Sequence, residues 1–196
     1  GISCGLRKTP RRKNISNYDD DTLNEVMNIR GYQINNMLAD DDLRQTPKFL
    51  ASGIDFDGYK KVIEEYEELK RLDNRIDFDD LQVLMYKAVK EDSRLLDVVR
   101  NAWDYIVVDE YQDISKVQLE ILKEIVKDPN KLTAIGDDDQ SIYEFRGSRA
   151  EYIVDFAVHF PGADRVVMGT NYRVPKNILM PVTYSISNNK KRVDTA

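Results

Sequence analysis

Short, mostly apolar runs alternate with helical patterns in the second half of the chain, and this alternation limits the possible folds more than any other feature. The runs occupy residues 105–108, 132–135 and 165–168, and each is too short for a helix. Runs of this kind are typical of strands in a parallel sheet that is covered on both faces. A helical stripe lies between the first two runs. The pattern therefore predicts a βαβ unit and an α/β fold.

Helical patterns dominate the first half. Apolar residues recur at helical spacing across 23–38, and Thr22 and Glu25 have the spacing of a capping box. A second pattern, which begins at Asp57, has apolar residues on one face and glutamates on another, as in an amphipathic helix. We therefore expect a small helical subdomain before the sheet.

Breaks separate these helical patterns. Three consecutive aspartates at 40–42, followed by Pro47, predict an exposed loop rather than a metal site. The basic run within residues 7–13 has no apolar period and predicts a solvated tail.

Three more helices are predicted in the second half. One follows Asp77 across 78–89, and one begins near Arg149 and ends at Pro161. The last follows Pro175 and contains Pro181, which predicts a kink or a late start.

Composition narrows the classes of site that the chain can contain. Cys4 and His159 are the only residues of their types among 196, which excludes an internal disulfide, a cysteine metal cluster and a histidine-rich zinc site. Any metal must be held by carboxylates, which favours magnesium. The net charge of −6 argues against binding nucleic acid mainly through a basic surface but leaves base stacking open. With no membrane-spanning apolar run and no signal-peptide core, we expect a cytoplasmic protein.

Polar residues follow all three predicted strands, at 109–113, 136–140 and 169–173. Ligands of open α/β sheets bind beyond the carboxyl ends of the strands. An Asp-Glu pair at the end of a buried strand suits a magnesium-nucleotide site, in which Asp109 holds the metal and Glu110 acts as general base. Taken alone, this pair is equally consistent with acidic residues that cap a strand or begin a helix.

The longer segments around these positions resemble a known family. Residues 109–113, 136–147 and 171–173 resemble three consecutive motifs of the UvrD/Rep family of superfamily 1 DNA helicases, in the same order and with similar spacing. The resemblance covers about residues 76 to 190. It implies an ATP-dependent motor that uses Mg²⁺ and moves 3′ to 5′ along single-stranded DNA.

The resemblance also implies roles for individual residues. Gln140 looks like the sensor that contacts the γ-phosphate or its water, because an amide can hydrogen-bond either group. Arg173 looks like the arginine that stabilises charge on the transferring phosphoryl group. Tyr172 looks like the aromatic residue that stacks on adenine. Without the resemblance, a surface position at a helix entry is the better interpretation of Arg173.

A third set of residues connects the motor to nucleic acid. Tyr143 and Phe145 are candidates for stacking on unpaired bases, which is worth about 1 to 3 kcal/mol per base. Arg146 is a candidate for a phosphate contact or a structural ion pair. The family usually has a larger aromatic residue where Phe145 stands, which implies weaker stacking here.

The implied fold is a RecA-like (P-loop NTPase-type) parallel sheet with flanking helices, incomplete and preceded by a small helical subdomain. We expect residues 1–75 to form part of an inserted helical subdomain, 76–168 the latter half of a first RecA-like domain, and 169–196 the start of a second. No glycine is followed by lysine, so the loop that cradles nucleotide phosphates is missing. We therefore expect a fragment with negligible ATP hydrolysis of its own and with a tendency to self-associate.

Three functions remain open for such a fragment. It is part of a DNA helicase that acts on single-stranded DNA and on junctions of single- and double-stranded DNA, part of a helicase-nuclease subunit, or a non-catalytic binding module derived from a helicase. The side-chain types at Asp109, Glu110, Gln140 and Arg173 argue against the third, because a module freed from catalysis has no chemical reason to keep all four.

Overall fold

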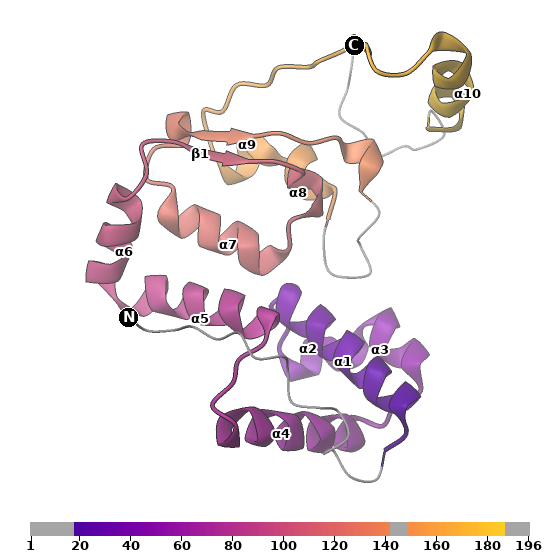
Figure 1. Ribbon diagram of the computed structural model, residues 1–196, viewed down its shortest axis with the longest axis vertical. Helices are drawn as coiled ribbons and strands as arrows, with labels where there is room; N and C mark the ends of the chain where they lie inside the picture. The colour runs from indigo at the N-terminus through magenta and orange to yellow at the C-terminus, as the bar shows by residue number, and fades with distance from the viewer. Residues whose placement is uncertain (1–17, 142–148, 187–196) are drawn as a thin grey trace.

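The computed structural model describes residues 18–141 and 149–186, which form a helical part followed by an α/β part (Figure 1). The helical part lies at the bottom of Figure 1, in indigo and purple. Its helices are α1 (Asp20–Asn35), α2 (Asp40–Gln45), α3 (Pro47–Ser52) and α4 (Phe56–Leu72). In the α/β part, α5 (Phe78–Glu91) and α6 (Ser93–Asn101) precede β1 (Ile106–Val108), α7 (Lys116–Ile125) and β2 (Leu132–Ala134).

The helical part has its own core, which confirms the two long helices expected there. Buried side chains from α1 to α4 form one cluster that includes Ile29, Leu43 and Tyr59. The capping box expected from Thr22 and Glu25 is wrong. Asp19 caps α1 instead and accepts a hydrogen bond from the Thr22 backbone, because the helix begins about one turn earlier than its apolar pattern.

The loop expected around the three aspartates is also wrong. Residues 40–42 form the first turn of α2, where acidic side chains complement the partial positive charge of a helix N-terminus. Thr46 then caps α3, whose first residue is Pro47, a position at which the missing N–H of proline costs nothing. Gly53 ends α3 in the left-handed conformation (φ 67°).

The βαβ unit is confirmed. β1 and β2 pair in parallel, with Ile106 opposite Leu132 and Val108 opposite Ala134. The connection between them contains α7, which begins with a capping box from Ser115 and Gln118. A second buried cluster, which includes Tyr111, Leu119 and Leu132, lies between these elements and the helices that follow β2.

The helix expected across 78–89 is present as α5, and Asp77 and Asp80 form a capping box at its start. Helix α5 packs against α7 within the α/β part, and α1 contacts both of them, which joins the helical part to the α/β part (Figure 1). Helix α6 was not predicted. Three short 3-10 helices flank the strands among the described residues. After β1 comes η2 (Tyr111–Asp113), before β2 comes η3 (Pro129–Lys131), and after β2 comes η4 (Asp138–Gln140).

The third expected strand, at 165–168, is wrong. Its residues have no strand pairing within the described part of the chain, and Val166 and Met168 are 86% and 90% exposed. A strand is stabilised by its hydrogen-bonded neighbour, and β1 and β2 pair only with each other among the described residues. An apolar run without such a neighbour stays extended but unpaired.

The helix expected from Arg149 to Pro161 is divided. The backbone leaves helical geometry at Asp155 (ψ 24°), which separates α8 (Glu151–Val154) from α9 (Phe156–His159). The expected end before Pro161 is confirmed. The last helix, α10 (Lys176–Ile186), begins directly after Pro175 and continues through Pro181, so the alternative of a late start is wrong.

The domain boundaries proposed from the sequence remain predictions, and the basic run at 7–13 lies outside the described residues. Among the helices described, none combines the length and the apolar character needed to cross a bilayer.

Candidate functional site

The ends of β1 and β2 lie directly beside each other. Beyond the paired strand residues, the Ile135 amide donates to the Val108 carbonyl (2.8 Å) and the Tyr111 amide donates to the Ile135 carbonyl (2.9 Å). These bonds carry the pairing past the strands and bring residues 109–112 next to residues 136–137. Two of the three polar segments predicted at strand ends therefore meet at one edge of the sheet.

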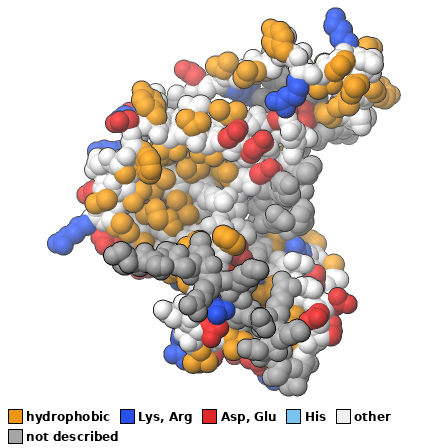
Figure 2. Space-filling view, in the orientation of Figure 1, with side chains coloured by type: hydrophobic (Ala, Val, Ile, Leu, Met, Phe, Trp, Pro, Cys, Tyr) orange, Lys and Arg blue, Asp and Glu red, His pale blue; other side chains and the backbone are white. Residues whose placement is uncertain are grey.

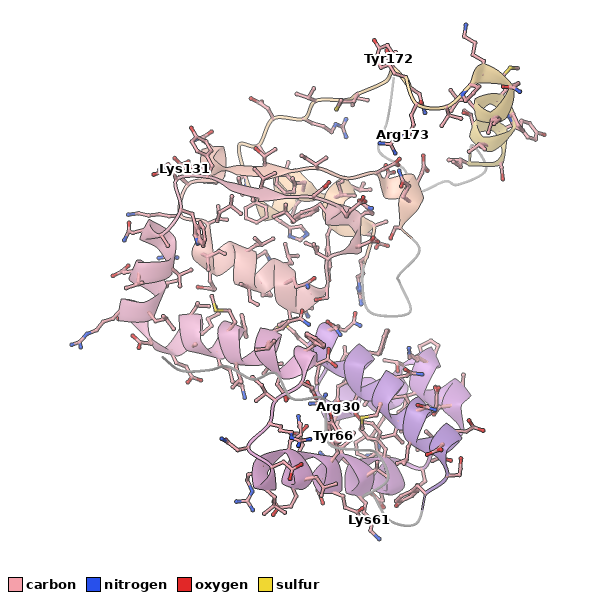
Figure 3. The ribbon with its side chains drawn as sticks, viewed as in Figure 1. Arg30, Lys61, Tyr66, Lys131, Tyr172 and Arg173 are labelled. Carbon is pink, nitrogen blue, oxygen red and sulfur yellow. The ribbon has the colours of Figure 1, made fainter. Side chains whose placement is uncertain are left out.

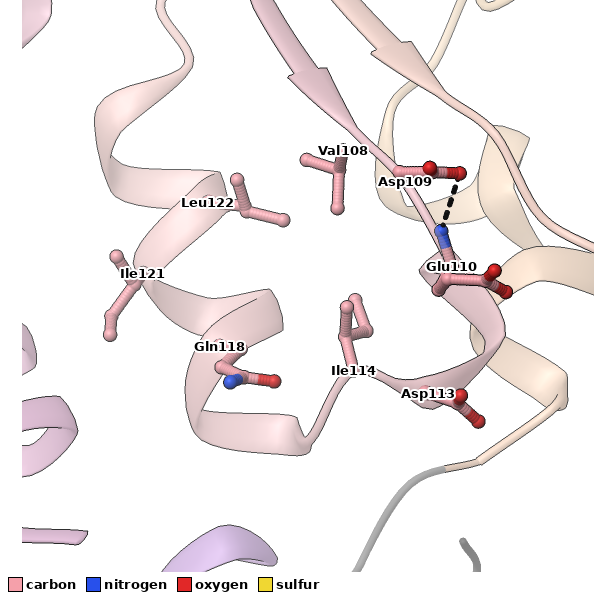
Figure 4. Close-up of a pocket in the computed structure, with 8 residues that line it drawn as sticks. All are labelled: Val108, Asp109, Glu110, Asp113, Ile114, Gln118, Ile121 and Leu122. Carbon is pink, nitrogen blue, oxygen red and sulfur yellow. Dashed lines mark hydrogen bonds between the residues drawn. The ribbon is translucent and has the colours of Figure 1, made fainter. Parts of the chain in front are cut away.

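Asp109 and Glu110 occupy the end of β1 (Figure 4). Glu110 has left-handed backbone geometry (φ 51°, ψ 42°), which costs a residue with a side chain about 1 to 3 kcal/mol. The Glu110 amide donates to Asp109 Oδ1 (2.9 Å), which fixes the first carboxylate against the turn. Strained backbone of this kind gathers at functional sites, so this turn is a candidate for one.

A pocket opens beside this turn and combines an acidic rim with an apolar wall (Figure 4). Its lining comes from the end of β1, the following turn and α7: Val108, Asp109, Glu110, Asp113, Ile114, Gln118, Ile121 and Leu122. On the face that carries β1, α7 and α5, Figure 2 shows gathered apolar side chains with acidic groups at one edge. Gln140 does not line this pocket.

A chain of hydrogen bonds nevertheless connects Glu110 to Gln140. Gln112 Nε2 donates to Glu110 Oε2 (2.7 Å), and Gln112 Oε1 accepts from the Asp137 amide (3.0 Å). Asp137 Oδ2 accepts from Gln140 Nε2 (2.6 Å). The structure thus brings Asp109, Glu110 and Gln140 to one edge of the sheet, as the sequence predicts.

Gly136 makes this close approach possible. A Cβ at this position would lie 2.5 Å from Gln112 Oε1, 2.7 Å from Ile153 Cδ1 and 3.1 Å from the Tyr111 amide nitrogen. Separations below 3 Å are not tolerated between such atoms, so only glycine lets β2 end this close to the turn after β1.

Burial changes the pKa values of two side chains at the site. Burial and, secondly, the neighbouring charge of Glu110 raise the pKa of Asp113 above its ordinary value. Burial also raises the pKa of Tyr111, whose side chain is fully buried behind the turn. The Asp113 carboxyl group therefore takes up a proton more readily than an isolated aspartate does.

The residues present fit a magnesium ion that is bound mainly by the phosphates of a nucleotide and by water. Within residues 18–141 and 149–186, no group of three or more His, Cys, Asp or Glu side chains is placed to hold a metal by itself. Magnesium in nucleotide sites is bound by one or two carboxylates together with waters and phosphates. A single carboxylate such as Asp109 is therefore a sufficient protein contribution.

The remaining predicted residues lie apart from this site. Tyr172 and Arg173 are on the extended segment between α9 and α10, at the top of Figure 3, and Tyr172 is 93% exposed. The Arg173 amide donates to Asn171 Oδ1, and no hydrogen bond or ion pair joins the Arg173 side chain to the pocket within the described part of the chain. Tyr143, Phe145 and Arg146 lie outside the described residues.

Sequence reasoning assigned no role to Gln112, Gly136 or Asp137. All three stand in the polar segments that follow the predicted strands, which is the one signal that singles them out. Their pairing across two segments depends on the strand register, and the register is visible only in the structure.

Comparison with known proteins places these features in a family. Residues 9–161 match the family model for the UvrD/REP helicase N-terminal domain. A probable DNA helicase II homolog from Mycoplasma capricolum is 39% identical over 127 residues, which cover 65% of this chain and 18% of that protein. DNA helicase II from Escherichia coli is 33% identical over 135 residues, which cover 69% of this chain and 19% of that protein.

A third relative, the putative ATP-dependent DNA helicase YjcD from Bacillus subtilis, is 36% identical over 132 residues, which cover 67% of this chain and 17% of that protein. The chain thus spans less than a fifth of the length of these curated relatives.

Proposed function

Because the chain belongs to the UvrD/REP helicase family, we propose that it forms part of an ATP-dependent motor that moves 3′ to 5′ along single-stranded DNA. The observation that carries this proposal is the hydrogen-bonded chain from Glu110 to Gln140 at the adjoining ends of two parallel strands. The family implies a RecA-like fold, with which the small parallel sheet described here is compatible. The cytoplasmic location remains a prediction.

In this proposal the acidic turn after β1 acts on the nucleotide. Asp109 would hold Mg²⁺, and the ion, when bound, would neutralise phosphate charge. Glu110 accepts a proton from the attacking water, and Gln112 Nε2 holds its carboxylate in place. Gln140 hydrogen-bonds the γ-phosphate or that water and so reports whether ATP is intact.

The other predicted residues act around this centre. Arg173 stabilises charge on the transferring phosphoryl group, and Tyr172 stacks on adenine, which requires the segment between α9 and α10 to approach the site. The exposure of Tyr172 supports such a role, because a stacking residue must be free of the core. Tyr143 and Phe145 stack on bases of single-stranded DNA, and Arg146 contacts a phosphate.

The test is ATP hydrolysis stimulated by single-stranded DNA, measured on the natural protein that contains this chain and on the 196-residue chain alone. We expect stimulation for the natural protein, and for Glu110→Gln a fall in kcat of about 10² to 10⁴, the usual contribution of a general base. We expect negligible hydrolysis by the chain alone, because no Gly-Lys pair is encoded in it.

Glu124→Gln is the matched control. Glu124 lies on α7 and pairs with Lys90 on α5, away from the acidic turn, so its loss leaves kcat unchanged. Full activity of Glu110→Gln, or the absence of any stimulation by DNA in the natural protein, would contradict the proposal.

A further inference from the structure

Gln112 is a buried polar residue at the centre of the site, and both the nitrogen and the oxygen of its side-chain amide have a partner. Its side chain is 1% exposed. The amide nitrogen donates to Glu110, the amide oxygen accepts from the Asp137 backbone, and the Gln112 carbonyl accepts from Ser141 Oγ (3.5 Å). A buried amide without such partners would destabilise the fold, so this arrangement is tightly determined.

The chemistry of the partners fixes which way the Gln112 amide points. The Asp137 backbone N–H is only a donor, so it must face the amide oxygen. An ionised Glu110 carboxylate is only an acceptor, so it must face the amide nitrogen. A flipped amide would place its NH₂ group against the Asp137 N–H, donor against donor, and its oxygen against the Glu110 carboxylate, acceptor against acceptor. Gln112 therefore holds the Glu110 carboxylate in a defined orientation.

Gln112 lies close against the end of the neighbouring strand. Its amide oxygen is 3.0 Å from the Asp137 amide nitrogen and 2.5 Å from the position that a Cβ of residue 136 would occupy. The ladder bond from the Tyr111 amide to Ile135 holds the adjoining backbone. Asp137 and Glu110 are thereby joined through one buried side chain.

We propose that Gln112 is a positioning residue that couples the general base Glu110 to the γ-phosphate sensor Gln140, by way of Asp137. This inference rests on the proposed function for its catalytic meaning. The route has three hydrogen bonds: Glu110 to Gln112, Gln112 to Asp137, and Asp137 to Gln140. A change in the contact between Gln140 and the nucleotide thereby alters how Gln112 holds the Glu110 carboxylate.

The link itself is tested by nuclear magnetic resonance on the 196-residue chain, without ATP. Glu110→Gln should shift the resonances of the Asp137 amide and the Gln140 side-chain amide. In a Gln112→Met background, which keeps the length of the side chain but removes both hydrogen bonds, these shifts should fall several-fold. Shifts of unchanged size at Gln140 without Gln112 would overturn the link.

Asp137→Ala supplies a second variant at an exposed position, where the lost capping bond to the Asp139 amide should lower stability only modestly and leave the chain folded. It keeps the backbone N–H that bonds Gln112 but removes the carboxylate that bonds Gln140. The effect of Glu110→Gln should then still reach the amide of residue 137 but no longer the Gln140 side chain. An effect that reaches Gln140 undiminished would overturn the route through Asp137.

The catalytic meaning is tested by DNA-stimulated ATP hydrolysis of the natural protein. Loss of a residue that orients a catalytic group typically costs about 10- to 100-fold in activity, and we expect this fall in kcat for Gln112→Met with little change in KM for ATP. Gln33→Met is the matched control, since the Gln33 side-chain amide is likewise hydrogen-bonded through both its nitrogen and its oxygen but lies in the helical part. It should lower stability and leave kcat unchanged.

The two claims fail in different ways. Unchanged kcat in a folded, DNA-stimulated Gln112→Met protein would overturn the coupling while leaving the proposed function intact. Intact resonance coupling in the 196-residue chain, combined with no DNA-stimulated hydrolysis by the natural protein, would overturn the proposed function and with it the catalytic part of this inference.

Discussion

At the scale of single residues, the site is determined by crowding between two strand ends. Glu110 adopts left-handed backbone geometry, and Gly136 takes the space that any side chain would need. Both features place the polar groups of neighbouring strands within hydrogen-bonding distance. The strain at Glu110 is maintained because the buried Gln112 and Tyr111 on its C-terminal side hold the turn.

Gly136→Ala should therefore destabilise the chain. The new Cβ would collide with Gln112 Oε1 and Ile153 Cδ1, and overpacking of this kind costs about 1 to 3 kcal/mol. Urea unfolding followed by circular dichroism measures the change in the free energy of unfolding. Gly169→Ala is the control, because nothing lies within 4 Å of its added Cβ. Equal stability of the two variants would show that the strand ends can separate without cost.

Part of this site could be predicted from the sequence. Asp109, Glu110 and Gln140 stand at the ends of predicted neighbouring strands, and parallel strands end at the same edge of a sheet. The linking role of Gln112 could not be predicted, because it depends on strand register and on the rotamer of one buried amide. Arg173 was expected at the same site, and its placement there remains a prediction.

At the scale of elements, a buried cluster of charges joins α1, α4 and the start of α5 (Figure 3). The Arg30 side chain, 7% exposed, contacts Glu67, Asp77 and Asp80 at 2.8 to 3.1 Å. Lys70, 4% exposed, contacts the same two aspartates. Burial opposes ionisation of Asp77, but the Asp80 amide, Arg30 and Lys70 together lower its pKa below the ordinary value. This cluster holds the helical part against the α/β part.

Arg30→Met should destabilise the chain strongly, because it leaves buried carboxylates without their partner. Breaking one side of a buried ion pair costs about 3 to 5 kcal/mol. Arg71→Met removes the same chemical group from an exposed pair with Glu68 on α4, which solvent screens, so its loss should cost far less. Thermal unfolding of both variants compares the two costs. A loss for Arg30→Met no larger than that for Arg71→Met would show that the cluster contributes little.

Helices and strands could be predicted where the spacing of apolar residues in the sequence matches the face that each element buries in the fold. The long amphipathic helix α4 and the βαβ unit carry their own periodicity, so both could be predicted. The short helices α2 and α3 could not, because their stability comes from packing Leu43 and Phe49 into the core beneath them. The run at 165–168 was interpreted as a strand from composition alone, although pairing depends on a neighbour that no local pattern encodes.

At the scale of the whole molecule, the α/β part exposes several large apolar side chains on and around its small sheet. Val107 on β1 is 64% exposed, and Trp103 and Tyr105 immediately before it are 64% and 71% exposed. Phe78 on α5 adds another exposed aromatic ring (79%). Exposed apolar side chains beside a strand with an unpaired edge favour association with another polypeptide.

We therefore expect the isolated chain to self-associate in a concentration-dependent manner, and Val107→Lys to shift it toward the monomer. A lysine on a strand edge opposes pairing, and at an exposed position it changes the free energy of unfolding by only about 0.5 kcal/mol. Sedimentation velocity at several concentrations measures the effect. Leu50→Lys introduces the same charge at an equally exposed position on α3 (67%) and should leave association unchanged, because it lies in the part whose core is complete. A wild-type chain that sediments as a monomer at every concentration would show that the apolar face of the α/β part does not recruit a second copy.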